Sequence, residues 1–140
     1  MAIVKSKICE FFNYAGSTFT DVPNLEVSIT TSGEPVQLQL QPAATTPDAA
    51  PGGSIGAYRT YGFFGFSRDG VRFPLVTLNA WQSSPSGNID IPCSALAYID
   101  TPPAGVHTYR VFMRISTAGN AETPTVNVTS AQLVAVSLPG

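Results

Sequence analysis

The sequence has few charged residues. Only 11% of its 140 residues are Asp, Glu, Lys or Arg, against roughly 25% in typical soluble domains. Nine acidic and seven basic residues give a net charge of −2. Because phosphate neutralisation requires clustered Lys and Arg, this balance argues against nucleic acid as a partner. The shortage also predicts that partner proteins, or Ser, Thr, Asn and Gln side chains, cover much of the surface.

Long hydrophobic runs are also missing. No segment approaches the roughly 20 apolar residues that span a membrane. The N-terminal stretch MAIVKSKICEFF lacks the apolar run of a secretory signal peptide. We therefore expect a protein made in the cytoplasm, with no membrane partner.

Residues that carry chemistry are scarce. The two cysteines, Cys9 and Cys93, fit no metal spacing, and we expect buried thiols, with a disulfide as the alternative. The single histidine, His107, falls on the predicted core face of a strand, where a hydrogen-bonded structural role is the more common one. A triad of Asp100, His107 and a serine would lack a nucleophile elbow. The sequence therefore predicts no enzyme, no cofactor and no metal site.

Short alternating runs, bounded by Pro, Gly, Asn and Ser, predict an all-β protein. We count about nine strands, which favours an antiparallel β-sandwich of the jelly-roll kind. Residues 25–30 and 36–41 alternate on either side of TSGEP, and we predict that they form a hairpin. The Asp-Gly turn at residues 68–70 predicts a second hairpin. The Pro- and Ala-rich residues 42–57 predict a surface loop.

Two strands carry apolar residues where an outer face would be polar. CSALAYI, residues 93–99, is apolar at nearly every position, so we expect both of its faces to be covered. In residues 106–116, Phe112 lies between Arg110 and Arg114 on the predicted polar face. An aromatic residue beside arginines is common at subunit interfaces, so we predict that these three residues face another chain.

Four runs carry a resemblance: VSITTSGEPVQLQL, FFGFSRDGVRF, DTPPAGVHTYRVFMR and AQLVAVSL. In this order they resemble the small trimeric jelly-roll proteins of the TNF/C1q-like type found in bacteriophages, over most of residues 20–138. The resemblance implies a homotrimer with aromatic residues around its threefold axis. By position, the candidates are Tyr61, Phe64, Tyr109 and Phe112. This fold hosts many functions, so the resemblance is more specific for fold than for function.

We expect a virion protein: a capsid decoration (cement) protein that binds the major capsid protein of a phage as a homotrimer. Residues 1–19 form an extended N-terminal arm before a jelly-roll domain at 20–140. Strand addition would lay the arm over a neighbouring subunit. Its candidate contacts are Ile3, Val4, Ile8, Phe11 and Phe12.

The alternative is a trimeric receptor-binding or lectin-like head. In this hypothesis, loops near residues 42–57 and 82–92 form shallow sites for a surface glycan. Tyr58 and Trp81 would then stack on a sugar ring. For Trp81, capping the end of the sandwich is the competing interpretation.

Overall fold

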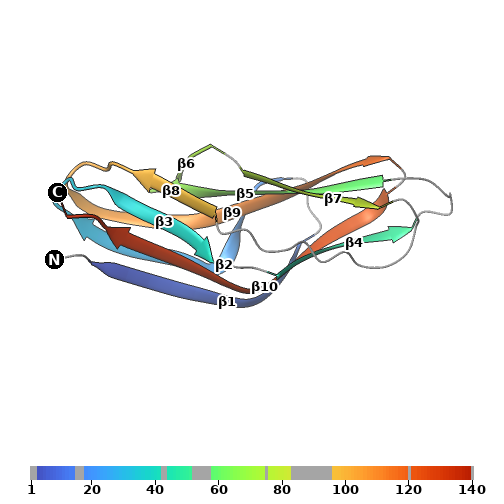
Figure 1. Ribbon diagram of the computed structural model, residues 1–140, viewed down its shortest axis with the longest axis horizontal. Coiled ribbons are helices and arrows are strands. Elements are labelled where there is room, and N and C mark those ends of the chain that lie inside the picture. The colour runs from blue at the N-terminus through green and yellow to red at the C-terminus, as the bar shows by residue number, and fades with distance from the viewer. Residues whose placement is uncertain are drawn as a thin grey trace.

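The structure is a computed structural model that describes residues 3–14, 18–41, 44–51, 58–74, 76–82, 96–119 and 121–139. Side chains are described for residues 3–9, 18–40, 63–74, 96–114 and 131–139. The described residues form ten strands, against about nine predicted, and no helix. The strands make two antiparallel sheets (Figure 1). The chain is therefore an all-β sandwich, as predicted.

Each sheet combines strands from distant parts of the chain. Sheet A has the order β1 (Val4–Tyr14), β10 (Ala121–Ser137), β3 (Val36–Gln41) and β8 (Leu96–Asp100), with β4 (Ala44–Pro51) also paired to β10. Sheet B has the order β2 (Thr20–Thr31), β9 (Gly105–Gly119), β5 (Tyr58–Arg68) and β6 (Val71–Arg72), with β7 (Val76–Gln82) also paired to β5. The first strand thus pairs with the last, and the second with the one before the last.

This nesting brings the first and last described residues close together, at the left in Figure 1. The backbone N–H of Ile3 donates to Ser137 Oγ at 2.8 Å. The N–H of Ser137 donates to the carbonyl of Ile3 at 2.9 Å, and the N–H of Leu138 donates to the carbonyl of Pro35 at 2.7 Å. These bonds satisfy backbone groups at the sheet end, which would otherwise be left unpaired.

The core lies between the sheets and follows the alternation of the strands. Side chains on one face of a strand recur at every second residue, and on β2 and β3 the inward positions are buried. Each buried Leu, Ile or Phe contributes roughly 1.5–3 kcal/mol of transfer free energy. The inward side chains include Leu25, Val27, Ile29, Val36, Leu38, Leu40, Phe64, Phe66, Val111, Met113 and Leu133.

The predicted hairpin of residues 25–30 and 36–41 is wrong, although both strands exist. β2 pairs with β9 in sheet B, whereas β3 pairs with β10 and β8 in sheet A. The turn between them carries the chain across the sandwich, so their apolar faces meet through the core. Gly33 has φ of 106°, and its N–H donates to Thr31 Oγ1 at 2.9 Å.

The second predicted hairpin, at residues 68–70, is confirmed. β5 and β6 pair through Ser67 with Arg72 and through Arg68 with Val71. The two turn residues, Asp69 and Gly70, have φ of 50° and 84°. Positive φ at both positions is typical of a type I′ turn, whose twist matches the flanking strands.

Two segments differ from the sequence prediction. Ala44–Pro51, inside the predicted loop, form β4 beside β10. Val4–Tyr14, most of the predicted arm, form β1 at the edge of sheet A in their own chain, and Cys9 is buried in the core. Cys93 lies outside the described residues. Pairing along the long strand β10 decides both cases, because strand formation depends more on context than on residue type.

Candidate functional site

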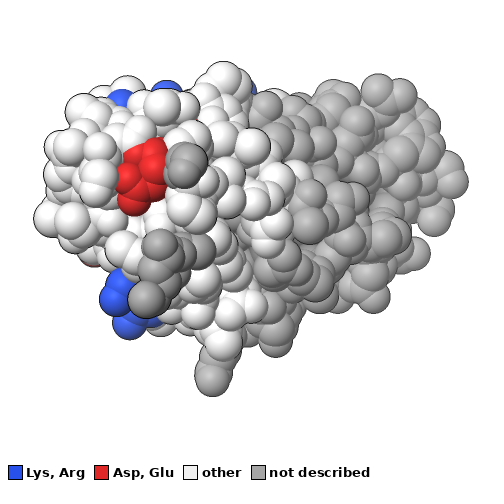
Figure 2. All heavy atoms as spheres, turned by 60° about the vertical axis from the view of Figure 1, so that its left-hand side comes forward, with Lys and Arg blue, Asp and Glu red and all other residues white. Residues whose placement is uncertain are grey.

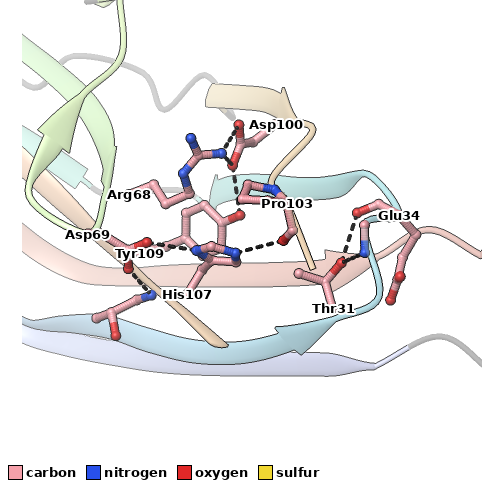
Figure 3. Close-up of polar contacts among 10 residues, drawn as sticks. Thr31, Glu34, Arg68, Asp69, Asp100, Pro103, His107 and Tyr109 are labelled. Carbon is pink, nitrogen blue, oxygen red and sulfur yellow. Dashed lines mark hydrogen bonds and ion pairs between the residues drawn. The ribbon is translucent and has the colours of Figure 1, made fainter. Parts of the chain in front are cut away.

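His107, the one histidine, lies at the start of β9 and is 8% exposed. Its Nδ1 lies 2.7 Å from Asp69 Oδ2, and its Nε2 lies 2.8 Å from the carbonyl oxygen of Pro103 (Figure 3). Both ring nitrogens therefore face acceptors, which favours the doubly protonated imidazolium. The predicted role of His107 as a buried, hydrogen-bonded residue is confirmed.

Asp69 is the partner that the sequence reasoning missed. Its Oδ1 accepts the backbone N–H of Thr108 at 2.8 Å, and its own N–H donates to the carbonyl of Thr108 at 2.9 Å. The hydrogen bond to Asp69 raises the pKa of His107. The bond from His107, followed by that from Thr108, lowers the pKa of the Asp69 carboxyl. The Asp69-Gly70 turn is thus fastened to β9 by an ion pair and two hydrogen bonds.

Asp100 makes a second polar group with different partners. Arg68 Nη1 donates to both of its carboxylate oxygens, at 2.9 and 2.8 Å. The Tyr109 hydroxyl donates to Asp100 Oδ2 at 2.8 Å. Burial raises the pKa of the Tyr109 phenol, and the bond to Asp100 raises it further. Asp100 therefore satisfies an arginine and a tyrosine at the core edge, and it does not contact His107 as a triad would require.

These contacts join three segments of the chain (Figure 3). They connect the β5–β6 turn, the end of β8 and the start of β9. The polar atoms of His107 and Asp100 are engaged within the chain, so the network stabilises the fold. Among the described residues, no group of three or more His, Cys, Asp and Glu could hold a metal ion.

The outer face of sheet A is a different kind of surface. Register places Val4, Ser6 and Ile8 of β1 opposite Val136, Val134 and Gln132 of β10, and directly opposed residues share a face. We call the following described side chains the sheet A outer face: Val4, Ser6, Ile8, Gln37, Gln39, Ala97, Ile99, Gln132, Val134 and Val136. None of these ten is charged.

Apolar side chains on this face are open to solvent in the single chain. Val4 is 59% exposed, Ile8 57% and Ile99 60%. Ile99 belongs to β8, which was predicted to be covered on both faces, yet the outward residues Ala97 and Ile99 are exposed. Figure 2 turns the left-hand end of Figure 1 toward the viewer. Charged atoms there occupy only small separate patches of the described surface.

The structure distributes the six predicted trimer-interface residues over different environments. Phe64, Tyr109 and Phe112 are at most 1% exposed within one chain, so their side chains offer no surface to a partner. Arg110 and Arg114 lie on the outer face of sheet B, where Arg110 Nε donates to Glu26 Oε2 at 2.7 Å. Tyr61 lies in β5, and its side chain is outside the described set.

The other predicted contacts lie in strands. Ile3, Val4 and Ile8 are exposed at the edge of sheet A, whereas Phe11 and Phe12 are in β1 with side chains outside the described set. Of the two proposed sugar-stacking residues, Tyr58 pairs with Gln82, and Trp81 pairs with Arg59 between β5 and β7. Of the second proposed ligand loop, residues 82–92, Gln82 ends β7 and the rest lie outside the described residues.

A shallow pocket of about 420 Å³ opens where the edge strands β1 and β2 meet. Lys7, Ile8, Asn24 and Glu26 line it. Asn24 has φ of 66° and lies in a bulge of β2, between Asp21 and Glu26. The bulge bends the free edge of sheet B, which discourages pairing with another strand.

The part of the chain that the structure describes contains no helix long and apolar enough to cross a membrane.

Comparisons with known proteins assign the chain to no family. No protein-family model matches the sequence, and no curated protein matches it.

Proposed function

We propose that this chain is a structural virion protein, a capsid decoration (cement) protein that binds a phage capsid as a homotrimer. The proposed fold is a jelly roll of the TNF/C1q-like type. The strand orders β1-β10-β3-β8 and β2-β9-β5-β6 support it, because nested pairing of first with last strands is expected of two wound-up Greek keys. Strands β4 and β7 then pair with the remaining lengths of β10 and β5, beyond the parts that pair with β3 and β6.

The sheet A outer face carries the proposal of self-association. It presents exposed Val4, Ile8 and Ile99 without a charge among its described side chains. A contiguous uncharged face with several apolar residues is typical of an interaction site. Further copies of the chain fit it, because the same face of each copy can converge around a threefold axis, and uncharged side chains leave no buried charge unpaired there. The family resemblance is the reason for proposing that three copies associate.

The proposed mechanism is mechanical. Trimers would bridge neighbouring copies of the major capsid protein and add contact area that opposes internal DNA pressure. Many weak contacts acting together give avidity far above that of any one. We propose no catalytic activity, because His107 and Asp100 are engaged in structural bonds. We expect neither nucleic acid nor membrane as a partner.

The decisive experiment measures mass and then capsid binding. Light scattering of the purified protein should give about three times the chain mass of 14.7 kDa. The trimer should saturate capsids at a fixed ratio, and capsids without it should lose DNA more readily on heating. A monomer would contradict the trimer, and unchanged particle stability would contradict the cementing role.

A trimeric receptor-binding or lectin-like head is the second candidate. The pocket between β1 and β2 favours it, since Lys7, Asn24 and Glu26 offer donors and acceptors around the apolar Ile8. Sugar hydroxyls suit such a mixed lining. A trimer that ignores capsids but binds a defined glycan on an array would support the head over the decoration protein.

A further inference from the structure

An aromatic–arginine cluster lies on the outer face of sheet B. We give this name to Phe19 before β2, Phe63 on β5, Arg72 on β6, and Phe112 and Arg114 on β9. The Phe19 and Phe112 rings meet edge to face, with centroids 5.3 Å apart. Phe112 pairs with Gly65 across β5, and the missing side chain of that glycine leaves room above the sheet.

The two guanidinium groups of the cluster are held by aromatic rings. The Arg72 Cζ lies 4.7 Å from the Phe19 centroid and 5.2 Å from that of Phe112. The Arg114 Cζ lies 5.0 Å from the Phe19 centroid and 4.5 Å from that of Phe63. Both cations therefore lie against Phe19, where cation–π attraction restricts their positions.

Neither cation has a carboxylate partner among the described residues. The other two arginines with described side chains do have one, since Arg68 binds Asp100 and Arg110 binds Glu26. Arg114 Nε is buried and has no hydrogen-bond acceptor in the part of the chain that the structure describes. Such a group costs free energy, because a buried donor has lost its water without gaining a partner.

Ring faces attract a guanidinium group but carry no negative charge, and they accept none of its in-plane hydrogen bonds. The fork of N–H donors matches an oxyanion, either a carboxylate or a phosphate. Arg72 is exposed, so a ligand from solvent reaches it. Asp21, which lies opposite Phe112 in the β2–β9 register, is exposed and forms no ion pair with either arginine. Neither guanidinium group is therefore neutralised by a carboxylate among the described residues, and the Arg72 group is open to solvent.

We propose that Arg72 and Arg114 bind the oxyanion of a small ligand, either free phosphate or the carboxylate of an acidic sugar. Phe19 and its neighbours fix the two arginines beforehand, which reduces the entropy lost on binding. The proposal goes beyond capsid decoration and does not depend on it, because self-association through sheet A leaves the outer face of sheet B open.

The test titrates the full chain separately with inorganic phosphate and with glucuronate, by calorimetry at low ionic strength. We expect binding of at least one, weakened by added salt because the groups are near the surface. Arg72→Gln and Arg114→Gln should each weaken that binding by about tenfold or more. Arg110→Gln is the matched control on the same face and should bind as the native chain does.

The two ligands distinguish the sources of the oxyanion. Equal affinity for both would indicate that the anion alone is recognised, whereas glucuronate binding without phosphate binding would indicate a sugar acid. If Arg114→Gln fails to fold, exposed Arg72 alone decides the outcome. The proposal is overturned if neither ligand binds at millimolar concentration, or if Arg72→Gln binds as tightly as the native chain.

Discussion

The outer faces of the two sheets differ in charge and in how far the chain itself covers their apolar side chains. The described side chains of the sheet A outer face include five apolar residues besides glutamine, serine and alanine, and no charge. The outer face of sheet B carries Asp21, Glu26, Arg72, Arg110 and Arg114. In a chain with so few charges, this separation leaves one face suited to burial against protein and the other suited to water or an anion.

The two faces also treat an outward apolar side chain differently. Phe112 on sheet B is 1% exposed, because Phe19 and Arg72 of the same chain lie over it. Ile99 on sheet A is 60% exposed, with no such cover from its own described residues. An apolar residue on an outer face therefore indicates a partner only where the chain itself leaves it open.

The largest expected effect comes from a charge on sheet A. Val136 lies on the central strand β10, opposite Val4 and Gln37. In the proposed trimer, with this face lining the threefold axis, Val136→Lys brings like charges of the copies together, which costs several kcal/mol. We expect association to weaken by about a hundredfold or more, seen as a fall to the single-chain mass by light scattering.

Thr30→Lys is the matched control for Val136→Lys. Thr30 is exposed on β2 of sheet B, opposite Val106. Adding a charge there should leave the assembly mass unchanged. If Thr30→Lys dissociates the assembly and Val136→Lys does not, the interface lies on sheet B and the comparison is reversed.

The next effect separates stability from association. Phe112→Ala removes a fully buried ring from sheet B, so the free energy of unfolding should fall by about 3 kcal/mol or more. Ile99→Ala on sheet A should change the unfolding free energy of the isolated chain by less than about 1 kcal/mol, yet weaken association. Urea denaturation at a concentration where the protein is dissociated measures the first quantity. Equal destabilisation by both changes would contradict the distinction between the two faces.

The sequence predicts the alternation of these strands but not their partners. Period-2 patterns identify β2, β3 and β9 correctly, because burial of one face dictates them. Whether residues 25–30 pair with residues 36–41 depends on which sheet receives each strand, and both arrangements bury the same side chains. The Asp69-Gly70 turn is predicted correctly because its positive φ values are a local property.

The candidate surfaces could not be predicted from the sequence, because each combines residues that only the fold brings together. The strand pattern predicts Phe112 as an interface residue, because residues near it in sequence do not show that the distant Phe19 covers it. The partnership of His107 with Asp69 likewise spans 38 positions. The uncharged sheet A outer face comes from β1, β3, β8 and β10 together. No single run in the sequence displays it.

A smaller effect concerns pH. The folded pKa of His107 is raised, so its contribution to stability is complete below the unfolded value of about 6.5. That contribution is lost as pH rises through the folded pKa. We expect at most about 1 kcal/mol, because the Asp69 side chain is 46% exposed and solvent screens the pair. Urea midpoints should fall between pH 6 and 8.5 in the native chain but not in His107→Gln.

Association should not follow this pH dependence. The described side chains of the sheet A outer face contain no titratable group, so the assembly mass should be the same at pH 6 and 8.5. A mass that changes between pH 6 and 8.5 would place a titratable group at the interface.

Asp69 makes stability depend on pH in the acid range, because its folded pKa is lowered. Its contribution to stability is present above the unfolded value of about 3.9 and is lost as pH falls through the folded pKa.

The smallest expected effect tests the other face directly. Arg110 pairs with Glu26, but the two side chains are 34% and 52% exposed, and such pairs contribute about 0–1 kcal/mol. Arg110→Ala should therefore lower the free energy of unfolding by less than about 1 kcal/mol and leave the assembly mass unchanged. Dissociation by this mild change would mean that Arg110 faces another chain, as the strand pattern alone predicts. The uncharged face of sheet A would then need a different partner, and the exposed Ile99 would point to that partner instead of to a second copy.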